Sequence, residues 1–248
     1  MDSVFQYLQD IKSKKGAGYI VLIDPDKKND DSLINQVETA NNSGVDALFV
    51  GGSLMMDSHH HDRVAQIKKH SEIPTIFFPG GVNQINNQYD AMLFMSLLSG
   101  RNPQYLIGEQ VVAAPIVNDM GMEVIPTGYL LFDGGAHSTV EVISGTKPLP
   151  MNRPDIAVAH ALAAEYMGKK LIYLEAGSGA IEAISTDIIR SIASETNVPL
   201  IVGGGIKTPK AAQERVEAGA SFIVTGTVLE DNGDSNLMKK FADAVHGG

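Results

Sequence analysis

The sequence predicts a modified (β/α)8 TIM barrel, because eight short apolar runs alternate with longer helical stretches along the chain. Most of the runs are continuously apolar, which is typical of strands that are buried on both faces of a parallel sheet. The eight predicted strands are 19–24, 46–51, 74–78, 91–96, 123–132, 171–176, 199–204 and 221–226. We expect them to form a single domain over residues 1–248, a length that allows one large core.

Helical stretches lie between most of the strands, and several begin with a residue followed by proline, a typical helix start. The predicted helices are 30–43, 59–70, 103–119, 153–168, 186–196, 208–218 and 234–245. One connection is too short for a helix. The segment "PGGVNQINNQYD" between Phe78 and Ala91 contains two glycines and three asparagines. We therefore expect a loop in place of the third barrel helix.

Composition excludes several classes of function. The net charge of −10 argues against a nucleic-acid-binding protein, which needs a basic surface. The chain has no cysteine, so disulfides, thiolate chemistry and cysteine-based zinc sites are excluded. No apolar run approaches the ~20 residues of a membrane span, and the first residues are polar. These features favour a cytoplasmic enzyme.

Three glycine-rich loops follow consecutive predicted strands: "AGSG" at 176–179, "GGGI" at 203–206 and "TGT" at 225–227. In a barrel, the loops after strands seven and eight commonly bind phosphate, because glycines let backbone N–H groups approach its oxygens. A single Gly-Gly pair is more often a tight turn. Three such loops at neighbouring strand ends indicate a phosphorylated substrate.

Acidic side chains occur at two of the predicted strand ends. Asp24 ends the first strand and Asp26 follows it, a position where carboxylates suit Mg²⁺ together with substrate phosphate oxygens, and the hydroxyl of Ser53 is a candidate third ligand. Asp26 also fits a helix cap. Glu175 directly precedes the "AGSG" loop and would be repelled by a phosphate. It can instead accept hydrogen bonds from substrate hydroxyls and take a proton from one of them. The structural alternative is a strand-end glutamate that faces solvent.

The motifs together resemble those of the geranylgeranylglyceryl phosphate synthase family, prenyltransferases built on a modified TIM barrel. They are "LIDPDK" at 22–27, "GGS" at 51–53, "LFMSLLSGRNP" at 93–103, "YLEAGSGA" at 173–180, "VGGGI" at 202–206 and "TGT" at 225–227. The resemblance covers essentially the whole chain. Other members carry a lysine where this chain has Leu22.

The resemblance implies transfer of a geranylgeranyl group from its diphosphate to the C3 hydroxyl of sn-glycerol 1-phosphate. The products are a prenyl ether of glycerol phosphate and free diphosphate. This ether bond is the first one formed in the biosynthesis of archaeal-type phospholipids. It implies Mg²⁺ at Asp24 and Ser53, and Glu175 as the catalytic residue. The residues that it implies for glycerol phosphate are Tyr173, Leu174, Glu175, Ala176, Gly177, Ser178, Gly179, Gly204, Gly205, Gly226 and Thr227. Phe94 and Met95 are candidates for the wall of a prenyl groove.

Two rival functions remain open from the sequence. One is a phosphosugar isomerase or synthase of the type found in histidine or tryptophan biosynthesis, with Asp24 and Asp133 as paired acids. The other is a phosphate-binding barrel without catalysis. We also expect a homo-oligomer, dimer or hexamer, because the helix at 156–168 is rich in alanine and apolar. Because the implied product is a lipid, peripheral contact between the protein and a membrane is also compatible with the sequence.

Overall fold

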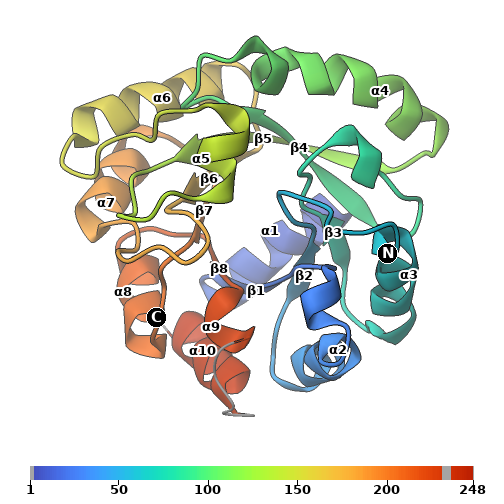
Figure 1. Ribbon diagram of the computed structural model, residues 1–248. Helices are drawn as coiled ribbons and strands as arrows, with labels where there is room; N and C mark the ends of the chain where they lie inside the picture. Colours follow the sequence, from blue (N-terminus) through green and yellow to red (C-terminus); the bar gives the residue numbers. More distant parts are fainter. Residues whose placement is uncertain (1–2, 231–235, 248) are drawn as a thin grey trace.

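The computed structural model describes residues 3–230 and 236–247, and it contains a closed barrel of eight parallel strands (Figure 1). Each strand pairs with the next along the chain, and β8 pairs back with β1. The strands are β1 Gly18–Ile23, β2 Ala47–Val50, β3 Thr75–Phe77, β4 Ala91–Leu97, β5 Glu123–Leu131, β6 Leu171–Glu175, β7 Leu200–Gly203 and β8 Phe222–Thr225. All eight predicted strands are present, so the predicted fold class is confirmed.

Side chains along each strand alternate between the inside of the barrel and the layer beneath the helices. In β6, Leu171 and Tyr173 belong to the inner core, whereas Ile172 and Leu174 pack in the outer one. Both faces are therefore apolar, which explains why the strands are continuously hydrophobic in sequence. The same alternation determines which side chains at the strand ends reach the barrel mouth.

The helices form a ring around the barrel (Figure 1). Those that match predicted helices are α2 Leu33–Asn42, α3 His60–His70, α4 Glu109–Asp119, α6 Pro154–Tyr166, α7 Thr186–Glu195, α8 Pro209–Glu217 and α10 Leu237–His246. The first turn of the predicted helix 103–119 is π-helical, η3 Gln104–Gly108. Residues 234 and 235, the predicted start of the last helix, lie outside the described residues.

No α-helix connects β3 to β4, a segment that is described throughout, and the ring is interrupted between α3 and α4 (Figure 1). The connection contains only one 3-10 turn, η2 Val82–Gln84. The predicted absence of the third barrel helix is confirmed. Without that helix, the side of the barrel between β3 and α4 is open to ligands.

Three helices were not expected from the sequence: α1 Val4–Lys15, α5 Thr139–Ser144 and α9 Thr227–Glu230. Helix α1 closes the far end of the barrel, with Val4 and Leu8 in the inner core. Glu123 at the start of β5 accepts hydrogen bonds from the backbone N–H groups of Val4 (2.6 Å) and Phe5 (2.9 Å). These bonds satisfy donors that a helix start leaves free. In the part of the chain that is described, no helix is long and apolar enough to cross a membrane.

Candidate active site

One cleft at the mouth of the barrel collects the polar residues from five strand ends. Among the side chains and backbone segments that line it are Asp24, Ser53, Tyr173, Glu175, Gly177, Ser178, Gly179, Gly204, Gly205, Gly226 and Thr227. Every residue expected from the sequence to bind glycerol phosphate or metal lines this cleft, with the exception of Leu174 and Ala176. Those two side chains belong to the outer core. Within "YLEAGSGA" they position the backbone and do not face a ligand.

Glu175 is the buried acid of the cleft, and only 7% of its surface is exposed. Its Oε1 accepts a hydrogen bond of 2.6 Å from the backbone N–H of Gly177. Burial raises the pKa of Glu175 to about 7, and the Gly177 hydrogen bond only partly opposes that rise. A carboxyl with such a pKa can accept or release a proton near neutral pH. The solvent-facing alternative for this residue is therefore wrong.

The hydroxyl of Tyr173 also lies in this part of the cleft. A Cβ added to Gly203 would stand 2.5 Å from the Tyr173 hydroxyl and 3.1 Å from Glu175 Oε2, so both groups face the same glycine. The hydroxyl is buried and makes no hydrogen bond to the described residues. Burial, with the neighbouring Glu175 charge second, raises the pKa of Tyr173 well above its usual value. It is therefore a neutral donor beside the Glu175 carboxylate.

The glycines of "GGGI" are required by close contact with that acid. Gly204 has a φ of +81°, and a Cβ added there would stand 2.4 Å from Glu175 Oε1 and 2.8 Å from the Gly177 nitrogen. Any larger residue would displace the carboxylate or the loop after β6. The run of glycines thus allows two loops and a buried acid to share a small volume.

The loops after β6 and β8 meet across the cleft. The hydroxyls of Ser178 and Thr227 are 3.2 Å apart, and Thr227 is the first residue of α9. Lys28 and Lys207 also line the cleft and add positive charge. Together with the backbone amides of the loops, these groups suit an anion such as phosphate.

Asp24 and the segment that contains Ser53 lie against each other on the opposite side of the cleft. A Cβ added to Gly52 would stand 2.4 Å from Asp24 Oδ1, so only glycine fits beside this carboxylate. The side-chain amide of Asn29 donates a hydrogen bond of 2.8 Å to the backbone carbonyl of Asp24. Within 3–230 and 236–247, no three His, Cys, Asp or Glu side chains are placed so that they could hold a metal ion by themselves. The chemistry of the Asp24 carboxylate fits Mg²⁺, which commonly takes one or two carboxylates and completes its shell with substrate oxygens and water.

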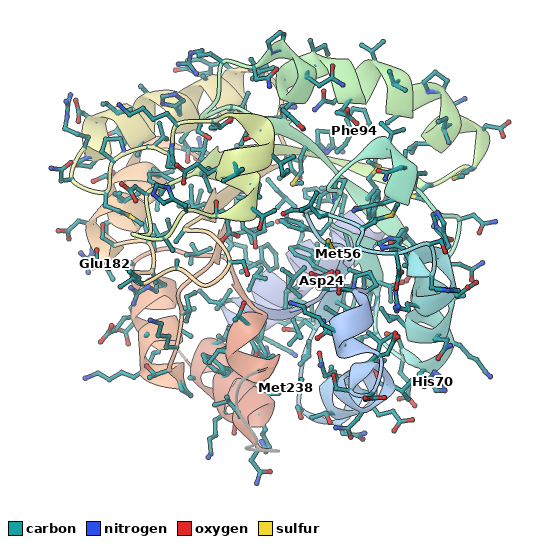
Figure 2. The ribbon with its side chains drawn as sticks, in the orientation of Figure 1. Asp24, Met56, His70, Phe94, Glu182 and Met238 are labelled. Carbon is teal, nitrogen blue, oxygen red and sulfur yellow. The ribbon has the colours of Figure 1, made fainter. Side chains whose placement is uncertain are left out.

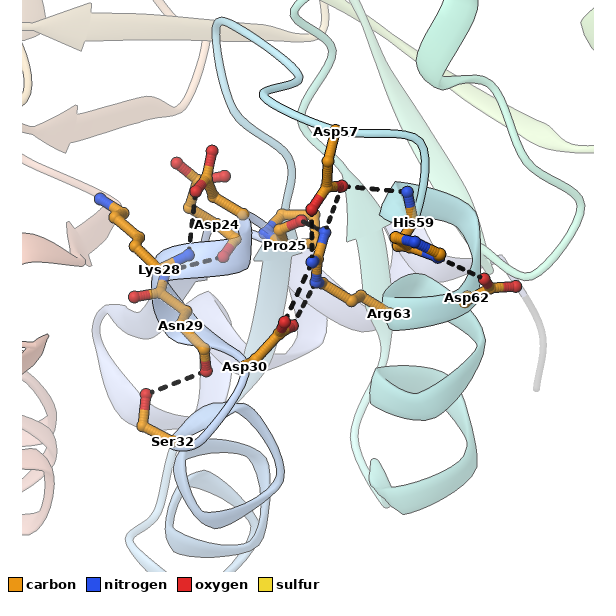
Figure 3. A network of polar contacts seen from close by, with 11 residues as sticks. Asp24, Pro25, Lys28, Asn29, Asp30, Ser32, Asp57, His59, Asp62 and Arg63 are labelled. Carbon is orange, nitrogen blue, oxygen red and sulfur yellow. Dashed lines mark hydrogen bonds and ion pairs between the residues drawn. The ribbon is translucent and has the colours of Figure 1, made fainter.

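Arg63 joins the two loops that contain Asp24 and Ser53 (Figure 3). It is buried at the start of α3 and pairs with Asp30 from the first loop and with Asp57 from the second. Its Nη1 and Nη2 atoms donate to the Asp57 carboxylate at 2.8 and 2.7 Å. These hydrogen bonds hold the pKa of Asp57 well below its usual value. The Arg63 guanidinium thus holds the two loops together beneath the cleft.

An apolar groove leads away from the cleft toward α4 through the gap left by the missing helix. Gly52, Ser53, Phe78, Tyr129 and Val140 line both spaces, so the groove and the cleft are continuous. The rings of Phe78, Tyr129 and Tyr173 pack together at the junction, with centroids 5.3 to 6.2 Å apart. Figure 2 shows Asp24 near the middle of the mouth and Phe94 farther out, beside α4. Phe94 and Met95 line the groove, as expected from the sequence.

The acid pair of the rival isomerase function is not brought together. Asp24 lines the cleft, whereas Asp133 is exposed and is not among its lining residues. The Asp133 carboxylate instead accepts a hydrogen bond of 3.0 Å from the backbone N–H of Gly135 in its own turn. The geometry therefore gives no support to paired acid catalysis by these two residues.

The fold and the cleft define a class of protein, a TIM barrel whose cleft for an anion lies at the C-terminal ends of its strands. The PcrB family matches residues 9–245, and the chain belongs to it. A geranylgeranylglyceryl phosphate synthase from Chitinophaga pinensis is 42% identical over 99% of this chain and 96% of its own length. One from Methanosphaera stadtmanae is 42% identical over 92% of this chain and 93% of its own length.

A solved structure has the same fold over its full length. The (S)-3-O-geranylgeranylglyceryl phosphate synthase from Thermoplasma acidophilum, in complex with its substrate sn-glycerol-1-phosphate, matches with a TM-score of 0.94 and 35% identity. The alignment covers 100% of both chains. The expected family is confirmed, and with it the expectation that the protein is an enzyme of the prenyltransferase class.

Proposed function

We propose that the protein transfers a geranylgeranyl group from geranylgeranyl diphosphate to the C3 hydroxyl of sn-glycerol 1-phosphate. The reaction forms a C–O bond between that hydroxyl oxygen and C1 of the prenyl chain. It breaks the bond between C1 and the diphosphate, which leaves with the electron pair. The hydroxyl proton passes to the Glu175 carboxylate.

A single observation carries this proposal: a buried acid with a pKa of about 7 borders glycine loops suited to a phosphate, in one cleft. An acceptor that has both a phosphate and free hydroxyls would use both halves of this arrangement. The loops of Gly177 and Gly204 and the Ser178–Thr227 pair would bind the phosphate. Glu175 would then orient the hydroxyls and accept the proton. The neutral Tyr173 hydroxyl would donate to an acceptor oxygen.

The donor fits the other half of the site. Its diphosphate would lie beside Asp24 and Ser53, and its apolar chain would extend into the groove past Phe78 and Met95. Mg²⁺ held by Asp24 and Ser53 would neutralise the leaving diphosphate. The aromatic side chains at the junction would keep water from the carbon at which substitution occurs.

Product analysis tests the function. Purified protein is incubated with sn-glycerol 1-phosphate and with prenyl diphosphates of several lengths, in Mg²⁺ or in EDTA, and products are measured by mass spectrometry. We expect geranylgeranylglyceryl phosphate only with Mg²⁺. If prenyl diphosphates are unchanged under all conditions while phosphate still binds, the protein is the phosphate-binding barrel without catalysis.

A further inference from the structure

The loop that replaces the third barrel helix contains a buried side chain that bonds to Gly52, the residue before the proposed metal ligand Ser53. Gln84, in the turn η2, is only 2% exposed although the loop around it is partly open. A long polar side chain is rarely so buried unless its amide is fully bonded. Its hydrogen bonds therefore indicate what it holds in place.

The Gln84 amide connects the loop to the end of β2. Its Nε2 donates a hydrogen bond of 2.8 Å to the backbone carbonyl of Gly52. Its Oε1 accepts one of 2.9 Å from the backbone N–H of Gly80. The two backbones are in close contact, since a Cβ added to Gly80 would stand 2.2 Å from the Gly52 carbonyl oxygen. Gln84 is thus the side chain that joins them.

Gly52 lies between this amide and the Asp24 carboxylate. Its Cα faces Asp24 Oδ1, and the next residue is Ser53, the other proposed metal ligand. A shift of the Gly52 backbone would therefore change the distance between the two ligands. The same loop is also attached to α4, because the Val82 N–H donates a hydrogen bond of 3.3 Å to Glu109 Oε2.

The loop also forms one wall of the apolar groove, through Gly80, Gly81, Val82 and Ile85. We infer that Gln84 is a positioning residue for the prenyl donor: it fixes the groove wall to Gly52 and so sets the place of the diphosphate and its metal relative to the chain. This inference rests on the proposed function and adds a role for a residue outside the cleft. Glycerol phosphate binds on the far side, at the loops after β6 to β8, and should not depend on it.

The test replaces Gln84 with methionine, which keeps the length and removes both hydrogen bonds. The matched control is Gln88→Met in the same loop, where the side chain is exposed and its amide bonds only to Asn87. Titration calorimetry measures the binding of the unreactive S-thiolo analogue of geranylgeranyl diphosphate with Mg²⁺, and separately the binding of sn-glycerol 1-phosphate. Steady-state kinetics gives KM for both substrates.

We expect Gln84→Met to weaken binding of the analogue about tenfold and to raise the Mg²⁺ concentration for half-maximal activity, with glycerol phosphate binding unchanged. Gln88→Met should match the wild type. If Gln84→Met does not fold, Gln84→Glu serves instead, because it keeps the acceptor for Gly80 but places a carboxylate oxygen against the Gly52 carbonyl. A folded variant with wild-type affinity for the analogue, and only a lower melting temperature, would overturn the inference. A wild-type protein that does not bind the analogue with Mg²⁺ would overturn the proposed function and the inference together.

Discussion

At Glu175, burial and a hydrogen bond shift the pKa of the carboxyl in opposite directions. Burial favours its neutral form, while the short hydrogen bond from Gly177 favours the charged form, and burial has the larger effect. Its folded-state pKa of about 7 is thus higher than the ordinary value of about 4.3 for glutamate. Between these two values the folded protein binds a proton that the unfolded chain releases. The stability contributed by neutral Glu175 is full below pH 4.3 and is lost as the pH rises through about 7.

Removal of the base at Glu175 tests its catalytic role. We expect Glu175→Gln to lower kcat by roughly 10²–10⁴, the usual range for general-base catalysis. In the wild type, kcat/KM for glycerol phosphate should rise with pH up to about 7, because only the deprotonated carboxylate can accept the proton. The variant should lose this dependence. Inorganic phosphate, measured by calorimetry, should bind the variant equally well or slightly better. Loss of phosphate binding with an unchanged rate would indicate a structural residue.

The metal proposal has its own test at Asp24. We expect Asp24→Asn to abolish Mg²⁺-dependent turnover, because an amide oxygen carries no charge to balance the cation. Circular dichroism should show a folded barrel, since Asp24 lies at a strand end and outside the core. Full activity of the variant at ordinary Mg²⁺ concentrations would show that Asp24 is not the ligand.

Among the elements, the strands were predictable from the sequence because burial on both faces makes each a continuous apolar run. Helix α1 was missed because only Val4 and Leu8 of it are buried and its last four residues, Lys12–Lys15, are all polar. Helix α5 has six residues, too few for a helical period to be recognised. The local pattern of apolar and polar residues does not predict such elements, because their stability comes from contacts with distant strands.

The candidate site was predictable to the extent that its residues lie in short motifs at strand ends. Arg63, Gln84 and Tyr129 were not expected, since each takes part through contacts with residues far from it in sequence. Arg63 is 33 positions from Asp30, and Gln84 is 32 from Gly52. The one signal available for Arg63 was an arginine two residues after the histidine run at the start of α3, and this gives no indication of its partners.

The loops at the ends of β1 and β2 should depend on Arg63. We expect Arg63→Met to lower the melting temperature by several degrees and to raise the Mg²⁺ requirement, because two carboxylates lose their common partner. The control Arg190→Met removes an exposed i,i+3 pair with Asp187, which contributes little. The pKa of Asp57 is held below its ordinary value, so the stability from this pair is present above about pH 3.9 and is lost only in more acidic solution. The difference in melting temperature should thus be constant from about pH 6 to 8, and a steep change there would contradict this account.

For the whole molecule, one surface is too apolar to face water alone. Helix α4 has no charged residue between its ends, and Val111, Val112 and Ile116 on it are 64%, 57% and 41% exposed. The neighbouring helix α6 is rich in alanine and has few charged residues. A helix without a polar face is normally covered on all sides. A second copy of the chain presents the same patch and can cover it symmetrically, so we propose a homo-oligomer through α4.

Light scattering coupled to size-exclusion chromatography tests this proposal. The wild type should have the mass of a dimer or a larger oligomer. We expect Val111→Arg, which places a charge in the apolar patch, to reduce that mass. Asn35→Arg adds the same side chain to the exposed surface of α2 and should not. A monomeric wild type, or a Val111→Arg protein of unchanged mass, would contradict the interface on α4.

We propose that one cleft recognises both the phosphate and the hydroxyls of the acceptor, through the glycine loops and Glu175. The most direct test is a competition in one reaction between deuterium-labelled sn-glycerol 1-phosphate and unlabelled sn-glycerol 3-phosphate, with geranylgeranyl diphosphate and Mg²⁺. A site that is built around hydrogen bonds to a hydroxyl discriminates strongly, because a misplaced hydroxyl leaves buried polar groups unpaired. Mass spectrometry should therefore find the label in nearly all of the ether product. Equal amounts of labelled and unlabelled product would contradict the account.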